Sequence, residues 1–104
     1  MVLEIIHWSE ARKPRESEIR RRLEDEGFRV LRWRDDAGAI YQAQAHDHDE
    51  SLWVVHGEIV FGVGGLTYPL SPGDRLNLPS GTVHTAYTGA DGCLYFIGQR
   101  EVSP

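Results

Sequence analysis

From Phe28 onward the sequence consists of short apolar runs that alternate with polar residues and are separated by glycine and proline. Alternation with a period of two places successive side chains on opposite faces of a strand, so each run predicts a β-strand. The expected strands cover residues 28–34, 39–46, 52–56, 58–63, 66–70, 75–78, 84–88 and 93–99. The pair Gly64-Gly65 predicts a tight two-residue hairpin. Many short strands with such turns are typical of an antiparallel sandwich or barrel.

The segment before these strands has a different pattern. A short edge strand is expected at residues 2–8 and a helix at about 15–26. The helix is supported by a preceding proline, acidic residues in the first turn, apolar residues four apart and a closing glycine, which are Pro14, Glu16, Glu18, Ile19, Leu23 and Gly27. We expect one domain over residues 1–104, with the N-terminal strand and helix in 1–27 and the barrel in 28–104.

Composition excludes several classes of partner. Eleven basic and sixteen acidic residues give a net charge of −5, which favours neither nucleic acid nor an anionic membrane as a partner. The run Arg20-Arg21-Arg22 is surrounded by acidic residues and is interpreted as a solvated helix face. There is no apolar run of roughly 18 residues and no signal-peptide pattern, so a cytoplasmic location is expected. The single cysteine, Cys93, excludes an intrachain disulfide and is interpreted as a buried small apolar residue.

The spacing of polar residues between positions 39 and 98 resembles the cupin superfamily. The first cupin motif reads H-x-H, three or four residues, E, six residues, G, and here six residues separate Glu50 from Gly57. The second motif reads G, five residues, P-x-G, two residues, H, three residues, N. It is matched at every spacing as far as the histidine, by Gly73, Pro79, Gly81 and His84. Fifteen residues separate the two motifs, as in short bacterial cupins. The resemblance implies an all-β fold, an antiparallel jelly-roll β-barrel with one N-terminal helix added here.

The match departs from the family pattern at two positions. Counting back from Glu50, the second histidine of the first motif is His46, but the first falls on Gln44. The closing asparagine of the second motif is replaced by Thr88. In an alternative register His46 and His48 form the histidine pair, but only Asp49 then precedes Glu50, which is too short for the motif. The register that keeps the spacing from Glu50 to Gly57 is preferred.

The resemblance implies a divalent transition metal (Fe, Mn, Ni or Zn) held by His46, Glu50 and His84. Two imidazoles and a carboxylate suit such an ion and leave coordination positions open. Gln44 is expected either to donate an amide oxygen as a weaker fourth ligand or to hold a bound water. The neighbouring residues Asp47, His48 and Asp49 are expected to belong to the mouth of the barrel rather than to the ligand set.

Three functions are consistent with these residues. The first is a metal-dependent enzyme of dioxygenase or isomerase type that acts on a small organic molecule. The second is a non-catalytic module that captures or senses a small ligand through the metal. The third is a metal-free structural barrel. A shared fold does not decide among them.

A homodimer that buries apolar strand surface and the N-terminal segment is also expected. The chain has several large aromatic residues for so small a barrel, among them Trp8, Trp33, Tyr41 and Trp53. A period of two places Tyr41 and Trp53 on the face opposite the candidate ligands, and an outward aromatic face favours a partner.

Overall fold

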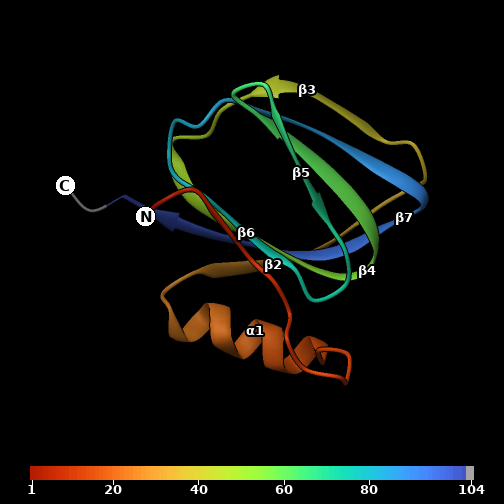
Figure 1. Ribbon diagram of the computed structural model, residues 1–104. Coiled ribbons are helices and arrows are strands. Elements are labelled where there is room, and N and C mark those ends of the chain that lie inside the picture. Colours follow the sequence, from red (N-terminus) through yellow and green to blue (C-terminus); the bar gives the residue numbers. More distant parts are fainter. Residues whose placement is uncertain (103–104) are drawn as a thin grey trace.

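Two long strands, β4 (His48–Val63) and β7 (His84–Glu101), pair with each other and connect the two halves of the molecule (Figure 1). The other elements of the computed structural model, which describes residues 1–102, are β1 (Glu4–Ile6), α1 (Glu16–Asp25), β2 (Arg29–Asp35), β3 (Ile40–Gln44), β5 (Leu66–Leu70) and β6 (Arg75–Leu78). The strand order is β1-β6-β4-β7-β2, with β5 added on β4 and β3 added on β7, and every pair is antiparallel. Over these residues the strand path stays open rather than closing into a ring. The expected antiparallel jelly roll with one N-terminal helix is confirmed.

All seven strands belong to one hydrogen-bonded sheet, which the bends in β4 and β7 divide into two halves, here termed the first and second sheets. The first part of β4 pairs with the last part of β7, as at Leu52 and Ile97, and β6, β1 and β2 extend this sheet. The last part of β4 pairs with the first part of β7, as at Phe61 and Ala86, and β5 and β3 extend the second sheet. Apolar side chains from both sheets form the inner core, which includes Leu52, Val54, Ile59, Phe61, Leu76, Leu78, Cys93 and Tyr95. Cys93 is thus buried, as predicted.

Glycines lie where the long strands bend from one sheet to the other. The sequence predicted separate strands on either side of Gly57 and of residues 89–92, but each pair is one continuous strand. The register of β4 on β7 shifts on both sides of Gly57, as β-bulges require. Gly57 and Gly92 have φ of 81° and 70°, and a Cβ on Gly57 would lie 2.1 Å from the carbonyl oxygen of Gly92. The glycine of the first motif is therefore needed because the backbones of β4 and β7 approach closely at the bend.

The expected outward orientation of Tyr41 is wrong. In β3, Tyr41 pairs with Ala86 and Gln44 pairs with His84, so the step of three residues on β3 faces a step of two on β7. This irregularity inserts one extra residue and reverses the alternation of faces. As a result both Tyr41 and Gln44 line the interior.

Helix α1 ends at Gly27 in a left-handed turn. Gly27, with φ of 88°, donates its N–H to the carbonyl of Glu24 at 2.9 Å, and Phe28 donates its N–H to the carbonyl of Leu23 at 3.0 Å. These two bonds define a Schellman motif, with Leu23 and Phe28 as its apolar pair. The predicted helix and its stop at Gly27 are confirmed. Among the described residues this helix is too short and too polar to cross a membrane.

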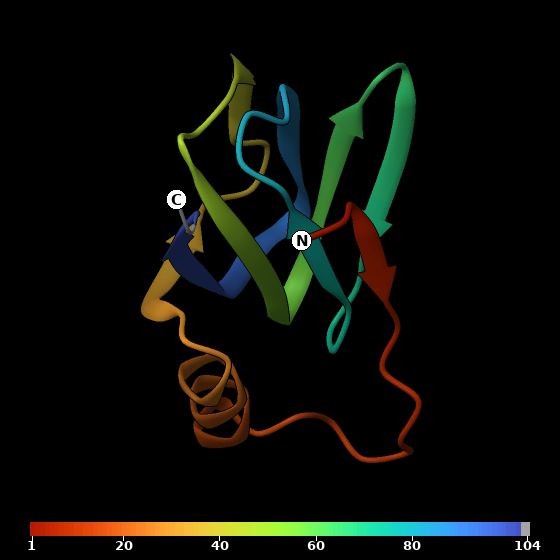
Figure 2. The ribbon, with the colours of Figure 1, turned by 90° about the vertical axis from the view of Figure 1, so that its left-hand side faces the viewer.

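The helix lies outside the barrel against one sheet (Figures 1 and 2). Its apolar residues Ile19 and Leu23 are fully buried and pack on Phe28, Trp53 and Phe96. Complete burial of each such aliphatic side chain contributes roughly 1.5–3 kcal/mol. Trp53 does point away from the interior, as expected, but α1 covers it and leaves only 5% exposed. The outward aromatic surface expected at Trp53 is therefore absent, because the chain's own helix covers it.

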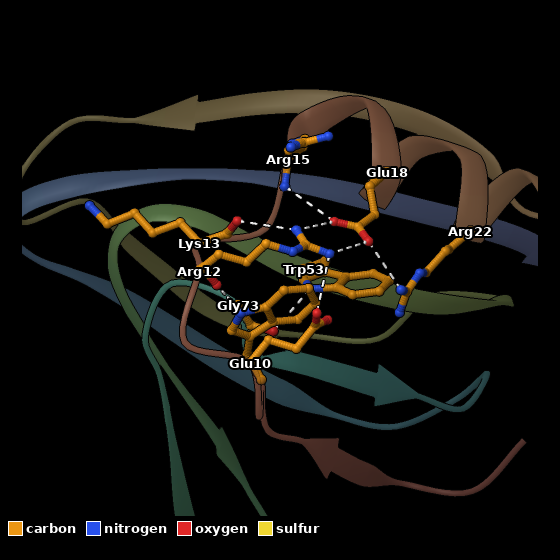
Figure 3. Close-up of polar contacts among 9 residues, drawn as sticks. Glu10, Arg12, Lys13, Arg15, Glu18, Arg22, Trp53 and Gly73 are labelled. Atoms are coloured by element: carbon orange, nitrogen blue, oxygen red, sulfur yellow. Dashed lines mark hydrogen bonds and ion pairs between the residues drawn. The ribbon is translucent and has the colours of Figure 1, made fainter.

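An ion-pair network joins the segment before α1 to the helix (Figure 3). The guanidinium of Arg12 donates to both carboxylate oxygens of Glu18 at 2.9 and 3.0 Å, and Arg22 donates to the same carboxylate at 3.1 Å. The hydrogen bond from Arg12 holds the pKa of Glu18 at about 2. The indole of Trp8 donates to the carbonyl of Arg12 at 2.6 Å. One member of the arginine run is therefore paired with an acidic side chain on its own helix.

A buried arginine joins α1 to the sheet. Arg75 of β6 is 6% exposed and donates in bidentate fashion to Glu26 at 2.9 and 2.7 Å. Its Nε donates to the hydroxyl of Ser51 at 2.6 Å, and its guanidinium lies 5.0 Å from the ring of Trp53. Bidentate pairing with a carboxylate and stacking on an aromatic ring are both geometries that suit arginine rather than lysine.

Candidate metal centre

The connection between β3 and β4 carries the residues of the first motif. Gln44 is the last residue of β3, His46 lies in the following loop, and Glu50 is in β4. The strand expected to reach His46 ends two residues earlier, because the chain must leave β7 here to begin β4. The position of His46 is therefore set by the loop and not by strand alternation.

Two hydrogen bonds attach the corner of the second motif to this loop. The N–H of Gly81 donates to the carbonyl of His46 at 2.8 Å, and the N–H of Ser80 donates to Oδ1 of Asp49 at 2.9 Å. Asp49 is 8% exposed, so it is a backbone anchor and not the mouth residue that was expected. The corner leads directly into β7 and its first residue, His84. These bonds bring the two motifs together in space.

Both motifs face one cavity of about 290 Å³. Gln44, His46, Glu50 and His84 all line it, and Glu50 and His84 are 6% and 4% exposed. The rest of its lining is aromatic, aliphatic or amide in character. The structure therefore places all four of the predicted site residues at one cavity, and their role as ligands stays a prediction.

His84 is oriented by the backbone of its own turn. Its Nδ1 lies 2.9 Å from the carbonyl oxygen of Thr82, and because a carbonyl only accepts, Nδ1 carries the proton. The neutral ring then has its lone pair on Nε2. The rings of His46 and His84 lie 5.4 Å apart between centroids. A backbone carbonyl on the second nitrogen is the usual arrangement of a metal-binding histidine.

The carboxylate of Glu50 lies between two histidines. Its Oε1 is 3.7 Å from Nε2 of His46, and its Oε2 is 3.0 Å from Nε2 of His48. The donor atoms of these three residues lie within 4.8 Å of one another, so the structure contains a second possible ligand set that includes His48. His48 does not line the cavity of about 290 Å³.

Both ring nitrogens of His48 are engaged by carboxylates. Nε2 bonds to Glu50, and Nδ1 is 3.3 Å from Oδ1 of Asp47. Burial lowers the pKa of His48, but the hydrogen bonds and charges of Glu50 and Asp47 outweigh this effect and raise the pKa above its usual value. While these bonds persist, His48 has no free lone pair to offer a metal.

Thr88, the residue that replaces the motif asparagine, forms hydrogen bonds with backbone groups and does not line the cavity. Its hydroxyl donates to the carbonyl of Asp36 at 2.6 Å and accepts from the N–H of Ala39 at 2.8 Å. It therefore fixes the turn between β2 and β3. The sequence had identified this departure from the motif but not its structural role.

A second polar cluster, which the sequence did not reveal, contributes Trp33, Tyr41 and Tyr95 to the lining of the same cavity. Asp35 is 9% exposed and accepts hydrogen bonds from Trp33, Tyr41 and Tyr95. The spacing of Trp33 and Asp35 on β2 was an available signal, since residues two apart share a face. The contribution of Tyr41 could not be found, because the irregularity in β3 reverses its expected face.

The donor set fits a first-row divalent metal. Two imidazoles, one carboxylate and the amide of Gln44 are the candidate ligands at this cavity, and this mixture of nitrogen and oxygen donors suits Mn, Fe, Ni or Zn. Hydrogen bonds that orient such ligands are present at His84 and Glu50.

Comparisons with known proteins agree with this architecture. The model of the family described as "Cupin domain" matches residues 31–97. KdgF from Halomonas sp. is similar over 73% of this chain and 71% of its own, with 26% identity and a TM-score of 0.64. An RmlC-like cupin from Shewanella frigidimarina matches over 72% and 67%, with 25% identity and a TM-score of 0.64.

The DMSP lyase DddQ from Ruegeria pomeroyi is also similar, with 26% identity and a TM-score of 0.65. The match covers 70% of this chain but only 38% of DddQ. No curated protein sequence matches this chain. The family match spans more than half of the sequence and includes both motifs, so this chain belongs to the cupin family.

Proposed function

We propose that this protein binds one divalent transition metal inside its barrel and uses it to bind and transform a small organic molecule. The observation that carries the proposal is the convergence of Gln44, His46, Glu50 and His84 on one cavity of about 290 Å³. A cavity near the lower end of the range of about 300–1,000 Å³ typical of ligand sites admits only a small molecule.

His46, Glu50 and His84 are the proposed ligands, with Gln44 as a weaker fourth. The free Nε2 of His84 favours this set over the one that contains His48. His48 instead orients the carboxylate of Glu50 through the bond of 3.0 Å. Metal-binding carboxylates are commonly held by such outer hydrogen bonds.

A bound ion at this position would supply Lewis-acid or oxygen-activating chemistry, as dioxygenases and isomerases require. The protein's own residues define the rest of the site. His48 holds the carboxylate in place, and Thr82 fixes the tautomer of His84. Apolar side chains, including Leu52 and Phe61, form much of the wall around the candidate ligands. The similarity to DddQ, which is named as a lyase, supports a catalytic role over a purely structural barrel.

The test is metal content and metal affinity of purified variants. His46→Ala and His84→Ala should each empty the site, because each removes a direct ligand. His48→Ala should leave the site largely filled, with a loss of about 10–100-fold in affinity, as is typical when an outer hydrogen bond is removed. His56→Ala is the matched control, since His56 does not line the cavity.

If His48→Ala empties the site and His84→Ala does not, the set of His46, His48 and Glu50 is correct and the proposed one is wrong. Failure of the wild-type protein to bind Mn, Fe, Ni or Zn would support the metal-free barrel. Oxygen uptake or turnover of candidate substrates by the metal-loaded protein separates an enzyme from a binding module.

A further inference from the structure

The cavity contains a second polar group displaced from the candidate ligands. Tyr95 of β7 pairs with Val54, whereas Glu50 lies four residues earlier on β4. Four residues of strand correspond to roughly 13 Å. On the other side, Tyr41 pairs with Ala86, two residues beyond His84 on β7, which corresponds to roughly 7 Å. The cluster of Trp33, Asp35, Tyr41 and Tyr95 is therefore displaced along the barrel from the candidate ligands, and Trp33, Tyr41 and Tyr95 line the same cavity.

The hydrogen atoms of this cluster converge on one carboxylate, and the indole N–H of Trp33 is shared with the hydroxyl oxygen of Tyr41 at 3.3 Å. Oδ1 of Asp35 accepts from the indole of Trp33 at 3.0 Å and from the hydroxyl of Tyr41 at 2.6 Å. Oδ2 accepts from the hydroxyl of Tyr95 at 2.7 Å. Burial, together with the hydrogen bond to Asp35, raises the pKa of both tyrosines, so both hydroxyls keep their protons near neutral pH.

Each tyrosine hydroxyl has only one hydrogen, and Asp35 takes it. The oxygen of Tyr95 can then offer the cavity its lone pairs but no hydrogen. The oxygen of Tyr41, which also accepts from Trp33 at 3.3 Å, keeps one lone pair for the cavity. Trp33 adds no acceptor, because an indole N–H only donates. This end of the cavity is therefore built to accept hydrogen bonds.

The charge of the lining adds a second restriction. Among the described residues, no lysine or arginine lines the cavity. The lining offers a bulky anion no cation to pair with away from the metal ligands, and burial of an unpaired charge is costly. The aliphatic and aromatic walls between the two polar ends favour an apolar body.

We propose that the cavity takes a largely apolar small molecule with a hydroxyl or amino group at the end away from the metal. The group is selected by Tyr41 and Tyr95, whose hydroxyl hydrogens are held by Asp35. This inference rests on the proposed function in one respect, since the other end of the small molecule would contact the metal. Recognition of the hydroxyl or amino group itself does not require the metal.

The test uses the full-length protein in EDTA, so that no probe can bind through a metal. The probes are 4-methylphenol, which donates a hydrogen bond, 4-fluorotoluene, which has similar shape but no donor, and 4-methylbenzaldehyde, which only accepts. Binding is followed by the shift of the Trp33 indole N–H in ¹H–¹⁵N spectra, assigned by its loss in Trp33→Phe. The wild type should bind 4-methylphenol about tenfold more tightly than either other probe, the effect of one net hydrogen bond.

Asp35→Asn should abolish this selectivity. Since Trp33 and Tyr41 both donate to Oδ1, the amide oxygen must remain there, and the amide nitrogen then faces Tyr95. The amide now donates to the oxygen of Tyr95 and frees its hydroxyl hydrogen for the cavity. Affinity for 4-methylbenzaldehyde should rise several-fold, and the preference for 4-methylphenol should fall to near unity.

Two further variants complete the experiment. Tyr41→Phe removes one acceptor while Trp33 still satisfies Oδ1, so it should weaken 4-methylphenol selectively even if Asp35→Asn does not fold. Tyr87→Phe is the control, because Tyr87 is 51% exposed and does not line the cavity. Equal affinities of the wild type for 4-methylphenol and 4-fluorotoluene would overturn the inference, even if the protein binds metal. Selectivity in a protein that binds no metal would instead support the inference and refute the proposed function.

Discussion

The histidines near the site differ in what occupies their second ring nitrogen. In His84 a backbone carbonyl takes the Nδ1 proton and leaves a lone pair on Nε2. In His48 carboxylates engage both nitrogens, so the ring serves as a hydrogen-bond partner of Glu50. A histidine whose second ring nitrogen bonds to a carbonyl keeps a lone pair for a metal. A histidine bonded to carboxylates through both nitrogens has none and can only orient its neighbours.

At position 44 we expect a substitution to strengthen the metal site. Gln44 pairs with His84 across the sheet and lines the cavity. A neutral amide oxygen binds Zn, Ni or Fe less well than imidazole does. Gln44→His should therefore raise metal affinity by about tenfold or more, and Gln44→Ala should lower it modestly. Calorimetric titration of the metal-stripped forms with Mn, Ni and Zn measures both effects.

The gain from Gln44→His should depend on pH. Imidazole must lose its proton to bind, so the added affinity should appear above about pH 6.5 and fade below it. Metal titrations at pH 5.5 and 7.5 test this dependence: the added affinity of Gln44→His should be present at pH 7.5 and largely lost at pH 5.5. Identical affinities for the wild type and both variants would mean that residue 44 does not contact the metal.

At the scale of elements, the bends of β4 and β7 depend on glycine. Gly57→Ala would require a positive φ and would place Cβ 2.1 Å from the Gly92 carbonyl oxygen. Gly38→Ala is the matched control, because Gly38 has φ of 70° with open space around it. The control should cost about 1–2 kcal/mol of unfolding free energy from backbone strain alone. Gly57→Ala should cost clearly more in urea unfolding, and an equal loss in both would show that the close approach is unimportant.

The attachment of α1 to the sheet should weaken in acid. The hydrogen bond from Arg75 lowers the pKa of Glu26, so the folded state binds the proton of this carboxyl less readily than the unfolded state. The stabilisation is therefore present above the unfolded pKa of about 4.3 and is lost as pH falls through the lower folded value.

Replacement of this carboxylate tests the pH effect directly. Because Glu26 is 45% exposed, Glu26→Gln should cost only about 1 kcal/mol at pH 7, and less as the pH falls below 4. Urea unfolding at several pH values measures the difference between variant and wild type. Glu24→Gln is the control on the same helix. A loss that does not change with pH would refute the role of the Glu26 charge.

At the scale of the whole molecule, we still expect a homodimer, but on a different surface. The helix covers Trp53, and Tyr41 faces the cavity, so neither residue can form the interface. Ile40 and Tyr87 pair across β3 and β7 and are 72% and 51% exposed. Apolar neighbours of this size on a sheet surface favour association.

Sedimentation at micromolar concentration should therefore find a dimer. Ile40→Lys should shift the protein to monomer without loss of secondary structure, because the new charge would be buried in the interface. Leu66→Lys is a control at an exposed apolar residue of β5, which is separated from β3 by β4 and β7. A monomeric wild type would refute the expectation.

The sequence alone was sufficient for the features governed by local rules. The hairpin at Gly64-Gly65 and the helix stop at Gly27 were predicted correctly, since each depends on a positive φ that glycine readily adopts. The fold class followed from the alternation of short apolar runs and from the spacing of the two motifs, which the family match confirms.

Tertiary structure alone decided the features that depend on the pairing of distant segments. The irregularity in β3 turns Tyr41 inward, and the continuous pairing of β4 with β7 replaces the predicted breaks. A single extra residue reverses the face of every side chain beyond it, so alternation cannot be followed through a bulge. The cluster around Asp35 is assembled from β2, β3 and β7, which no local pattern joins. The residues at one end of the cavity, Gln44, His46, Glu50 and His84, could therefore be predicted from the motifs. The cluster at the opposite end could be recognised only from the packing of the strands.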